Sequence, residues 1–266
     1  MKIIVAGNGF VGSAVIAAIE KIAEVIIVDP RFNDNKVSDH SDADGIIVCV
    51  GTPEEEDGSC DITQIVSVLN YTPVGMPVLI KSTVPPNYLD MIVKRYVNND
   101  ICYSPEFLRA AYAKADFINQ SYIILGGEDP GRLWEHLFEQ SLPLYQGTIH
   151  TTLVEASMIK YATNTFLATK VSYFNQIYEM CQANGANYNL VSAVMARDPR
   201  IGTSHLMVPG PDGARGFGGA CFPKDTSALL HYSKDININM SILDAAVSYN
   251  STLRTEILKF AGVKLN

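Results

Sequence analysis

The segment KIIVAGNGFVG, residues 2–12, decides the fold of the first half of the chain. Its first five residues form an apolar, β-branched run that is typical of a buried strand. Glycines follow in the spacing G-x-G-x-x-G, in which Gly7 permits a tight turn, Gly9 lets the backbone approach a pyrophosphate and Gly12 allows close packing of helix on strand. The segment therefore predicts a strand, a phosphate-binding turn and a helix.

An acidic residue after the next strand extends this pattern to a dinucleotide site. Asp29 follows the apolar run EVIIV (24–28), and a carboxylate there can hold a ribose 2′-hydroxyl and repel a 2′-phosphate. The amides of Phe10 and Val11, at the start of the predicted helix, would add donors and the positive end of a helix dipole. Arg31 leaves NADP open as an alternative, because a guanidinium could receive the extra phosphate. We predict NAD as the cofactor.

Strand and helix patterns alternate over the first 150 residues. The runs that are typical of buried parallel strands are KIIVA (2–6), EVIIV (24–28), GIIVCV (45–50), PVLIK (77–81) and SYIILG (121–126). Helices are expected between and after them, over residues 11–22, 62–69, 85–96, 107–115 and 132–140. This alternation is typical of βαβ units, so we predict the α/β class with a doubly wound parallel sheet, a Rossmann domain over residues 1–150.

The second half of the chain has a helical pattern. Long helices are expected over residues 153–184 and 242–260, with shorter ones over 189–196 and 224–233. Residues 198–219 are rich in glycine and proline and predict a loop. We therefore predict a mainly α-helical domain over residues 151–266.

Composition excludes several classes of protein. A net charge of -8 and a pI near 5.1 argue against a nucleic-acid binder, which would carry a basic face. The five cysteines are scattered and form no C-x-x-C pair, so neither a disulfide framework nor a metal site is predicted, and free thiols suit a reducing compartment. No apolar run approaches the roughly 18 residues of a membrane span. We expect a soluble cytoplasmic protein.

Two residues of the long predicted helix stand out. Lys160 and Asn164 are four positions apart and therefore lie on one face of that helix. Their neighbours in sequence are mostly apolar, and burying an ammonium group is costly unless it is paired. The alternative is that the lysine stem packs while its charged end reaches water.

Two motifs follow predicted strands of the first domain. KSTVP (81–85) contains Thr83, and SPEFLR (104–109), which follows the short predicted strand ICY (101–103), contains Glu106. Ligands of open parallel sheets bind beyond the carboxyl ends of the strands, so both side chains are expected at such a crevice. Each of them could, alternatively, be only a helix cap.

The decapeptide GFGGACFPKD, residues 216–225, places a cysteine between glycines and charged residues. Cys221 could be a small buried residue in a tight turn. It could also be a nucleophile, with the glycines leaving room for another molecule and Asp225 as its acid–base partner. Lys224 receives no role from the sequence.

Together, these motifs resemble those of the UDP-glucose/GDP-mannose dehydrogenase family. The segments that carry the resemblance are GNGFVG (7–12), DGSCD (57–61), KSTVP (81–85), SPEFLR (104–109), KYATN (160–164), DPRIG (198–202) and GFGGACFPKD (216–225). The resemblance implies a four-electron, NAD-dependent oxidation of the C6 alcohol of a nucleotide sugar, with UDP-glucose converted to UDP-glucuronate. GDP-mannose and UDP-N-acetyl-hexosamine are alternative substrates.

The resemblance also implies catalytic roles for six residues. Cys221 would attack the C6 aldehyde to give a thiohemiacetal and then a thioester, while Lys160 and Asn164 would stabilise the oxyanion at C6. Asp225 would assist proton transfer, Glu106 would act as the base for hydrolysis of the thioester, and Thr83 would help to hold the water.

Binding residues follow from the same resemblance. The implied cofactor-binding residues are Gly7, Gly9, Phe10, Val11, Gly12, Asp29, Thr52 and Thr83. The implied substrate-binding residues are Glu106, Phe107, Leu108, Arg109, Lys160, Asn164, Arg200, Phe217 and Gly218. Arg200 would reach the substrate of a neighbouring subunit, so a homodimer is implied.

The chain departs from the family pattern in two places. Ala110 stands where family members usually carry a second glutamate, which alters the site for the hydrolytic water. The length of the chain leads us to expect that the family's C-terminal domain is lacking, and residues 207–215 are a candidate to cover the substrate instead.

Two other classes remain as alternatives. The 3-hydroxyacid dehydrogenases also join a Rossmann domain to a helical domain with a K-x-x-x-N motif, but they do not need the cysteine loop. A non-catalytic NAD-binding relative is the second alternative, although nearly all residues with implied chemical roles are present.

Overall fold

The computed structural model describes the backbone of residues 1–260 and the side chains as far as residue 254. The chain forms two compact units. The first unit contains Met1–Glu55 and Cys60–Lys160, and the second contains Glu56–Ser59 and the chain from Tyr161 onward. The division falls within the helix α6 (Leu153–Ala183), which contributes to both units. The sequence-based domain limits at residues 150 and 151 stay a prediction, and residues 261–266 lie outside the described residues.

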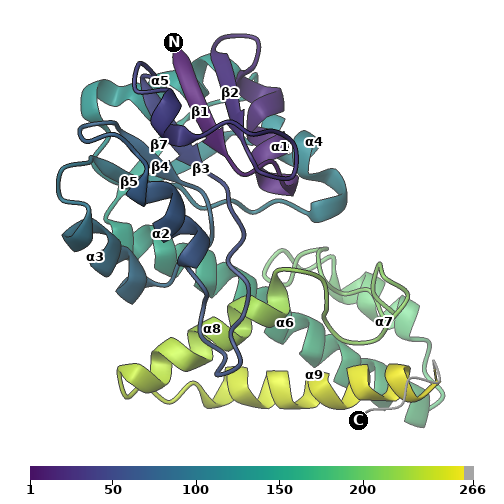
Figure 1. Ribbon diagram of the computed structural model, residues 1–266. Helices are drawn as coiled ribbons and strands as arrows, with labels where there is room; N and C mark the ends of the chain where they lie inside the picture. The colour runs from purple at the N-terminus through teal and green to yellow at the C-terminus, as the bar shows by residue number, and fades with distance from the viewer. Residues whose placement is uncertain (261–266) are drawn as a thin grey trace. The chain divides into compact units, whose positions relative to one another are not determined.

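The first unit is built on a seven-stranded sheet with the order β2-β1-β3-β4-β5-β6-β7 (Figure 1). Its strands are β1 (Lys2–Ala6), β2 (Glu24–Val28), β3 (Gly45–Val48), β4 (Val78–Ile80), β5 (Ile101–Tyr103), β6 (Tyr122–Gly127) and β7 (Gly147–Thr151). The first five strands are all parallel, with β1 between β2 and β3. This order reverses direction at β1, as in a doubly wound sheet, so the predicted fold class is confirmed.

The strand β6 corrects the prediction that SYIILG is a parallel strand. It pairs antiparallel to β5, and β7, which the sequence did not reveal, then pairs parallel to β6. A parallel crossover needs a connection that carries the chain back along the whole strand. Between β5 and β6 the main helix is α4 (Ala113–Ile118), which has only 6 residues, so the chain enters β6 from the edge at which β5 ends.

The helices of the first unit are α1 (Phe10–Ile19), α2 (Thr63–Asn70), α3 (Pro86–Arg95), α4 and α5 (Leu133–Ser141), with short 3₁₀ turns at Val37–Asp39, Ala110–Tyr112 and Pro130–Arg132. The predicted helix over 107–115 is wrong in its first part. There, the amide of Leu108 donates to the Glu106 carboxylate (2.7 Å) and the amide of Arg109 donates to Asp116 (2.9 Å). These side-chain acceptors compete with helical hydrogen bonds, so regular helix starts later.

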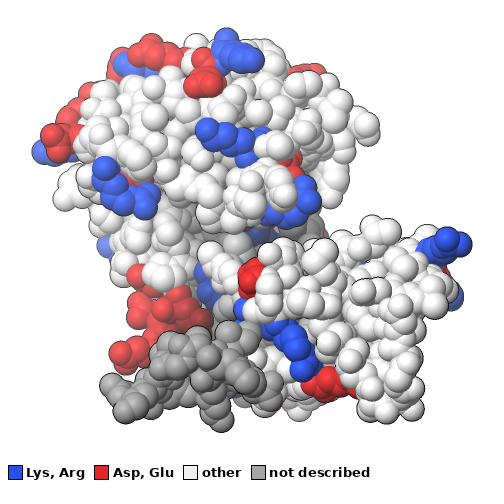
Figure 2. Space-filling model, turned by 90° about the vertical axis from the view of Figure 1, so that its right-hand side faces the viewer, with Lys and Arg blue, Asp and Glu red and all other residues white. Residues whose placement is uncertain are grey.

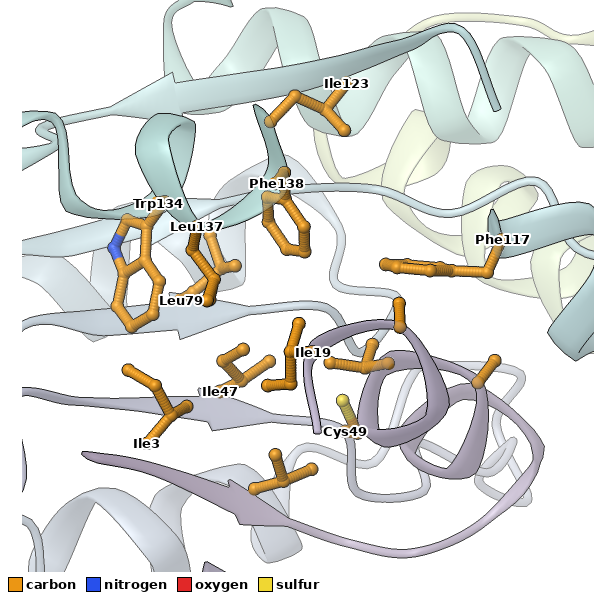
Figure 3. Close-up of a cluster of buried hydrophobic side chains, with 14 of the residues drawn as sticks. Ile3, Ile19, Ile47, Cys49, Leu79, Phe117, Ile123, Trp134, Leu137 and Phe138 are labelled. Carbon is orange, nitrogen blue, oxygen red and sulfur yellow. The ribbon is translucent and has the colours of Figure 1, made fainter. Parts of the chain in front are cut away.

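A large apolar cluster fills the sheet face covered by α1, α4 and α5 (Figure 3). Ile3 and Val5 of β1 point into it, and Ile4 points to the opposite face and is also fully buried. Trp134 lies wholly inside the cluster, while Phe117 and Phe138 meet edge to face with ring centroids 5.9 Å apart. Burial on both faces explains why the strands are continuous apolar runs.

The second unit contains most of α6 together with α7 (Tyr188–Met195), α8 (Phe222–Asp235) and α9 (Ser241–Phe260). Each of these helices lies where the sequence predicts one. Asn187 caps α7 by accepting from the amides of Asn189 and Leu190. A smaller apolar cluster holds α6 and α7 to the loop before α8, and its buried members are Phe174, Cys181, Tyr188, Leu206 and Val208.

A short segment of the first 150 residues belongs to the second unit. Residues 56–59 are counted with it, and Gly58 adopts a φ of +85°. A Cβ at Gly58 would lie 2.7 Å from the hydroxyl of Ser227 on α8, so only glycine fits this approach. His231 of α8 lies 3.7 Å from the carboxylate of Asp57.

The charged surface agrees with the acidic composition. On the face shown in Figure 2, acidic and basic side chains are mixed and no broad basic field appears. Within the described residues, none of the helices combines the length and the apolar character that crossing a membrane requires.

We expect Trp134→Ala to lower the free energy of unfolding by about 3–5 kcal/mol, because it empties a fully buried site in the core. Urea unfolding followed by circular dichroism measures this loss. Tyr71→Ala is the control, because Tyr71 is 65% exposed and should change stability little. An equal loss in both variants would contradict the role given to this cluster.

Candidate active site

The glycine turn after β1 is shaped by close backbone contacts. Gly7 has a φ of +92°, and a Cβ there would lie 2.7 Å from the carbonyl oxygen of Cys49. A Cβ at Gly12 would lie 1.9 Å from the carbonyl oxygen of Gly7, so any larger residue would push α1 off the turn. Gly7 and Gly12 are therefore required by the fold itself.

Gly9 differs from these two glycines. Its φ is -76°, which any residue can adopt, and among the described atoms nothing lies within 4 Å of where its Cβ would be. Gly9 is also the N-cap of α1, where no side chain caps the helix and no acidic residue occupies the first turn. A space of this kind, in front of unpaired helix amides, suits a phosphate group, so the turn fits the pyrophosphate of NAD.

Asp29 is buried at the end of β2, with 3% exposure. Its carboxylate accepts from the amide of Asn8 (2.8 Å) and from the guanidinium of Arg31 (2.7 and 3.1 Å). The bonds from Arg31 are the largest of the effects that hold the pKa of Asp29 far below its usual value. Asp29 is thus ionised and could accept a hydrogen bond from a ribose hydroxyl, and its pairing with Arg31 weakens the NADP alternative. Thr52, beyond β3, is buried at 6% exposure.

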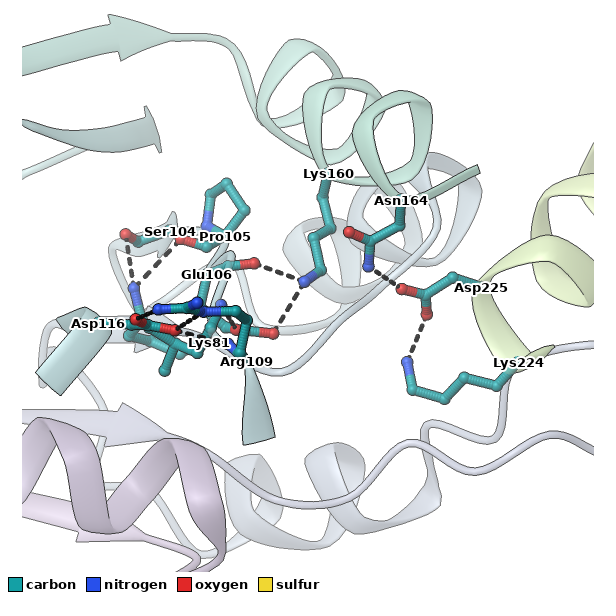
Figure 4. Close-up of polar contacts among 11 residues, drawn as sticks. Lys81, Ser104, Pro105, Glu106, Arg109, Asp116, Lys160, Asn164, Lys224 and Asp225 are labelled. Carbon is teal, nitrogen blue, oxygen red and sulfur yellow. Dashed lines mark hydrogen bonds and ion pairs between the residues drawn. The ribbon is translucent and has the colours of Figure 1, made fainter. Parts of the chain in front are cut away.

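Glu106 and Lys160 form a buried ion pair in the first unit (Figure 4). The Lys160 ammonium donates to Oε1 of Glu106 at 2.8 Å and also to the backbone carbonyl of Glu106. Lys160 is 2% exposed and Glu106 is 5% exposed, so the alternative in which the lysine reaches water is wrong. The second carboxylate oxygen of Glu106 accepts from Leu108, and the Phe107 ring centroid lies 5.5 Å from the ammonium.

Asn164, Asp225 and Lys224 form a second network, which lies in the second unit (Figure 4). The Asn164 amide donates to Oδ2 of Asp225 at 2.6 Å, and the Lys224 ammonium donates to Oδ1 at 2.5 Å. Asp225 is 1% exposed and lies in the first turn of α8. Lys224, which the sequence left without a role, therefore neutralises a buried carboxylate.

Cys221 is the N-cap residue of α8 and is partly exposed. The helix that it begins is 14 residues long, so its first amides and the positive end of its dipole favour a negative charge at this position. The carbonyl oxygen of Cys221 accepts from the Asp225 amide at 2.9 Å. The thiol and the carboxylate thus sit on one helical turn.

Two buried asparagines that sequence reasoning missed hold the glycine loop before Cys221. The Gly216 amide donates to Asn175 of α6 (3.1 Å), and Asn250 of α9 both accepts from the Phe217 amide (2.6 Å) and donates to its carbonyl (3.0 Å). Gly216 has a φ of +74°. A buried asparagine in a helix is a usable sequence signal only when the buried face of that helix is already known.

Other predicted substrate-binding residues lie on the surface. The Arg200 side chain is 87% exposed and is paired with Asp198, and the Arg109 side chain is 71% exposed and is paired with Asp116. Ala110 is exposed as well.

Three predicted residues remain: Thr83, Phe217 and Gly218. Thr83 is buried in the first unit, where its carbonyl accepts from the Cys60 thiol at 3.7 Å. Phe217 is buried in the second unit, and a Cβ on Gly218 would meet the Arg254 guanidinium at 2.9 Å.

The segment 207–215 is attached to the second unit. Arg254 of α9 donates to the carboxylate of Asp212 at 2.8 Å, and Arg215 pairs with Glu179 of α6. Within the segment, the Gly210 amide donates to the carbonyl of Ala214. The segment is therefore an ordered part of the helical unit. That it covers a substrate stays a prediction.

We expect Gly9→Ala to weaken NAD binding at least about tenfold while leaving the melting temperature nearly unchanged, because the methyl group fills only the space in front of α1. Gly12→Ala is the matched variant and should instead lower the melting temperature, because its Cβ meets a backbone oxygen. Calorimetric NAD titration and thermal unfolding separate the two effects. Unchanged NAD affinity in folded Gly9→Ala would contradict the assignment.

Comparisons with known proteins agree with this geometry. Models of the UDP-glucose/GDP-mannose dehydrogenase family match residues 31–145 as the NAD binding domain and residues 154–252 as the central domain. The UDP-glucose 6-dehydrogenase YwqF of Bacillus subtilis (strain 168) is 34% identical over 223 residues, which are 79% of this chain and 49% of that protein. The chain thus spans about half the length of the curated relatives it matches.

Solved structures show the same fold at low sequence identity. A UDP-glucose dehydrogenase from the hyperthermophilic archaeon Pyrobaculum islandicum matches with a TM-score of 0.81 and 23% identity, over 94% of this chain and 68% of that one. The 3-hydroxyisobutyrate dehydrogenase of Mycobacterium tuberculosis matches with a TM-score of 0.73 and 15% identity, over 94% and 93% of the two chains. The chain belongs to the UDP-glucose/GDP-mannose dehydrogenase family and carries that family's NAD-binding domain.

Proposed function

We propose that this chain oxidises the C6 alcohol of a nucleotide sugar to a carboxylate with two equivalents of NAD, and that UDP-glucose is its substrate. The observation that carries the proposal is the placement of Cys221 at the start of α8, one turn from the buried Asp225 network and after a glycine loop held by two asparagines.

A thiol at this place suits covalent chemistry on an aldehyde. The thiolate is the reactive form, and the α8 amides favour its negative charge. The Cys221 sulfur would bond to C6 of the aldehyde, and the carbonyl oxygen would become an oxyanion or, with a proton, the hydroxyl of a thiohemiacetal. Asp225 is within the same turn and would take or return that proton. The thioester formed by the second oxidation would be cleaved by water, which restores the thiol and releases the carboxylate.

NAD would accept one hydride from C6 in each of the two oxidations. The glycine turn and the N-terminus of α1 would hold its pyrophosphate, and Asp29 would hold a ribose hydroxyl. Thr52 and Thr83 are assigned to the same cofactor.

Lys160 and Asn164 would act on the C6 oxygen as a cation and a neutral donor. In the structure their donors are engaged by Glu106 and Asp225, respectively. An ammonium group carries three N–H donors and an amide group two, so each side chain could keep these bonds and donate to a substrate oxygen as well. For Glu106 to act as base, one of its carboxylate oxygens would accept from the hydrolytic water beside the present bond from Lys160 to Oε1 or from the Leu108 amide to Oε2.

The proposal includes a homodimer in which Arg200 contacts the substrate of the other subunit. The exposure of Arg200 supports this, because a residue that reaches a neighbour must project from its own unit. GDP-mannose and UDP-N-acetyl-hexosamine are the alternative substrates. A two-electron oxidation is a second candidate reaction, which the fold match to 3-hydroxyisobutyrate dehydrogenase favours.

The stoichiometry of the reaction distinguishes these candidates. We expect two NADH per nucleotide sugar consumed for the wild type, measured by absorbance against a panel of UDP-glucose, GDP-mannose and UDP-N-acetyl-hexosamines. Cys221→Ala should give no more than one NADH per sugar, because the thioester route requires the sulfur. Glu106→Gln should accumulate a covalent adduct on Cys221, detected by mass spectrometry of the intact protein.

Cys181→Ala is the matched control, because Cys181 is a buried thiol of the same unit in the apolar cluster. It should retain the two-NADH stoichiometry. One NADH per sugar from the wild type would favour the two-electron reaction. NAD binding without turnover on any sugar, in wild type and Cys221→Ala alike, would leave the non-catalytic alternative.

A further inference from the structure

Lys81 is a buried cation for which neither the fold nor the proposed mechanism so far provides a use. It follows β4, is 2% exposed and forms no ion pair with any of the described carboxylates. Its ammonium donates to the Ser104 hydroxyl at 3.0 Å and to the Pro105 carbonyl at 3.4 Å (Figure 4). The ring centroids of Phe117 and Phe138 lie 5.4 and 5.7 Å away.

A buried ammonium group lowers the stability of the fold, and the pKa of Lys81 reflects this cost. Burial is the main cause that lowers the pKa of Lys81 from 10.5 to about 8. A methionine of similar length would fill the same apolar site without this penalty. The lysine therefore calls for a role that depends on its charge or on its hydrogen bonds.

The acceptors of Lys81 lie directly before Glu106 in the chain. Ser104 and Pro105 lead from the end of β5 into the carboxylate that pairs with Lys160. The position of the Glu106 backbone is thus set on one side by Lys81, through Pro105, and on the other by Lys160, through the Glu106 carbonyl.

The titratable groups that face Lys81 come from several elements. They are Cys49 beyond β3, Cys102 of β5, Glu106 after β5 and Lys160 of α6. Burial raises the pKa of both thiols to about 12, so neither is an anion at neutral pH. Glu106 is the one carboxylate among these groups, and it is therefore the charge on which Lys81 acts.

We propose that Lys81 is a positioning residue for the Glu106–Lys160 pair, in which its ammonium fixes the Ser104–Pro105 backbone that leads into Glu106 and adds a second positive charge near that carboxylate. Under the proposed function, on which this inference rests, the thioester hydrolysis requires a Glu106 carboxylate that is fixed in place.

A double-mutant cycle in urea unfolding tests the coupling without reference to activity. The variants are Lys81→Met, Glu106→Gln and the double variant, at pH 7. Lys81→Met should change the equilibrium constant of unfolding at least about threefold more in the wild type than in Glu106→Gln, because the charge it removes acts on the carboxylate. Additive effects would overturn the proposal. If Lys81→Met does not fold, the same cycle with Ser104→Ala and Glu106→Gln decides, because Ser104→Ala removes one of the two acceptors.

The pH dependence of stability supplies a second readout. Between pH 8 and 10.5 the unfolded chain binds a proton at Lys81 that the folded chain has lost, so the wild type gains stability relative to Lys81→Met as pH rises through this range. Urea unfolding of both proteins at pH 7.5 and 10 measures this difference. A constant difference would mean that Lys81 is not a buried titrating group.

Turnover then separates positioning from a merely structural role. In Lys81→Met kcat should fall, because Glu106 is no longer held in place for the thioester hydrolysis. The Cys221 adduct should accumulate, while NAD affinity stays within about threefold of the wild type. A wild-type kcat without an adduct on Cys221 would overturn the role of Lys81. Absence of turnover in the wild type would instead refute the proposed function, and the unfolding cycle would still decide the coupling.

Discussion

The buried ion pair between Glu106 and Lys160 is the interaction on which the arrangement of polar groups depends. It fixes the third turn of α6 to the segment after β5 in the first unit. The Ser157 hydroxyl, one turn earlier, donates to the Val84 carbonyl at 2.7 Å and fixes the same stretch of α6 to the KSTVP segment. The same helix continues into the second unit, where its Asn164 donates to Asp225 of α8. One helix therefore carries a contact of each polar network.

Much of the fold could be predicted because the decisive signals are local. The glycine spacing of residues 7–12 and the apolar runs reported the turn and six of the seven strands. The direction of β6 was not predictable in this way, because pairing direction depends on how far the preceding segment carries the chain. β7 was missed because its residues, GTIHT, are partly exposed and only partly apolar. The predicted helix over 107–115 was wrong in its first part because the carboxylates of Glu106 and Asp116 accept from backbone amides there. Helix propensity takes no account of such bonds.

The candidate site was predictable where a motif carries it and unpredictable where packing does. Lys160 and Asn164 stood out by spacing, yet only the structure shows that both are buried and that each pairs with a different carboxylate. Asn175, Asn250 and Lys81 were missed as participants, since a polar residue in a helix or after a strand is ordinarily solvated. Their burial, at 1%, 8% and 2% exposure, is a property of the assembled fold. The roles of the site residues remain proposals.

Residues 56–59 belong to the second unit although the chain on both sides of them belongs to the first, and this limits how the chain can be cut into its two units. The chain passes from one unit to the other at residue 55, returns at residue 59 and crosses again at residue 160. No single cut can therefore yield two complete units. A fragment that starts at Tyr161 would leave Ser227 of α8 without the glycine that covers it. If the first unit were exchanged between relatives, the incoming loop of residues 56–59 would therefore have to match α8 of the recipient chain.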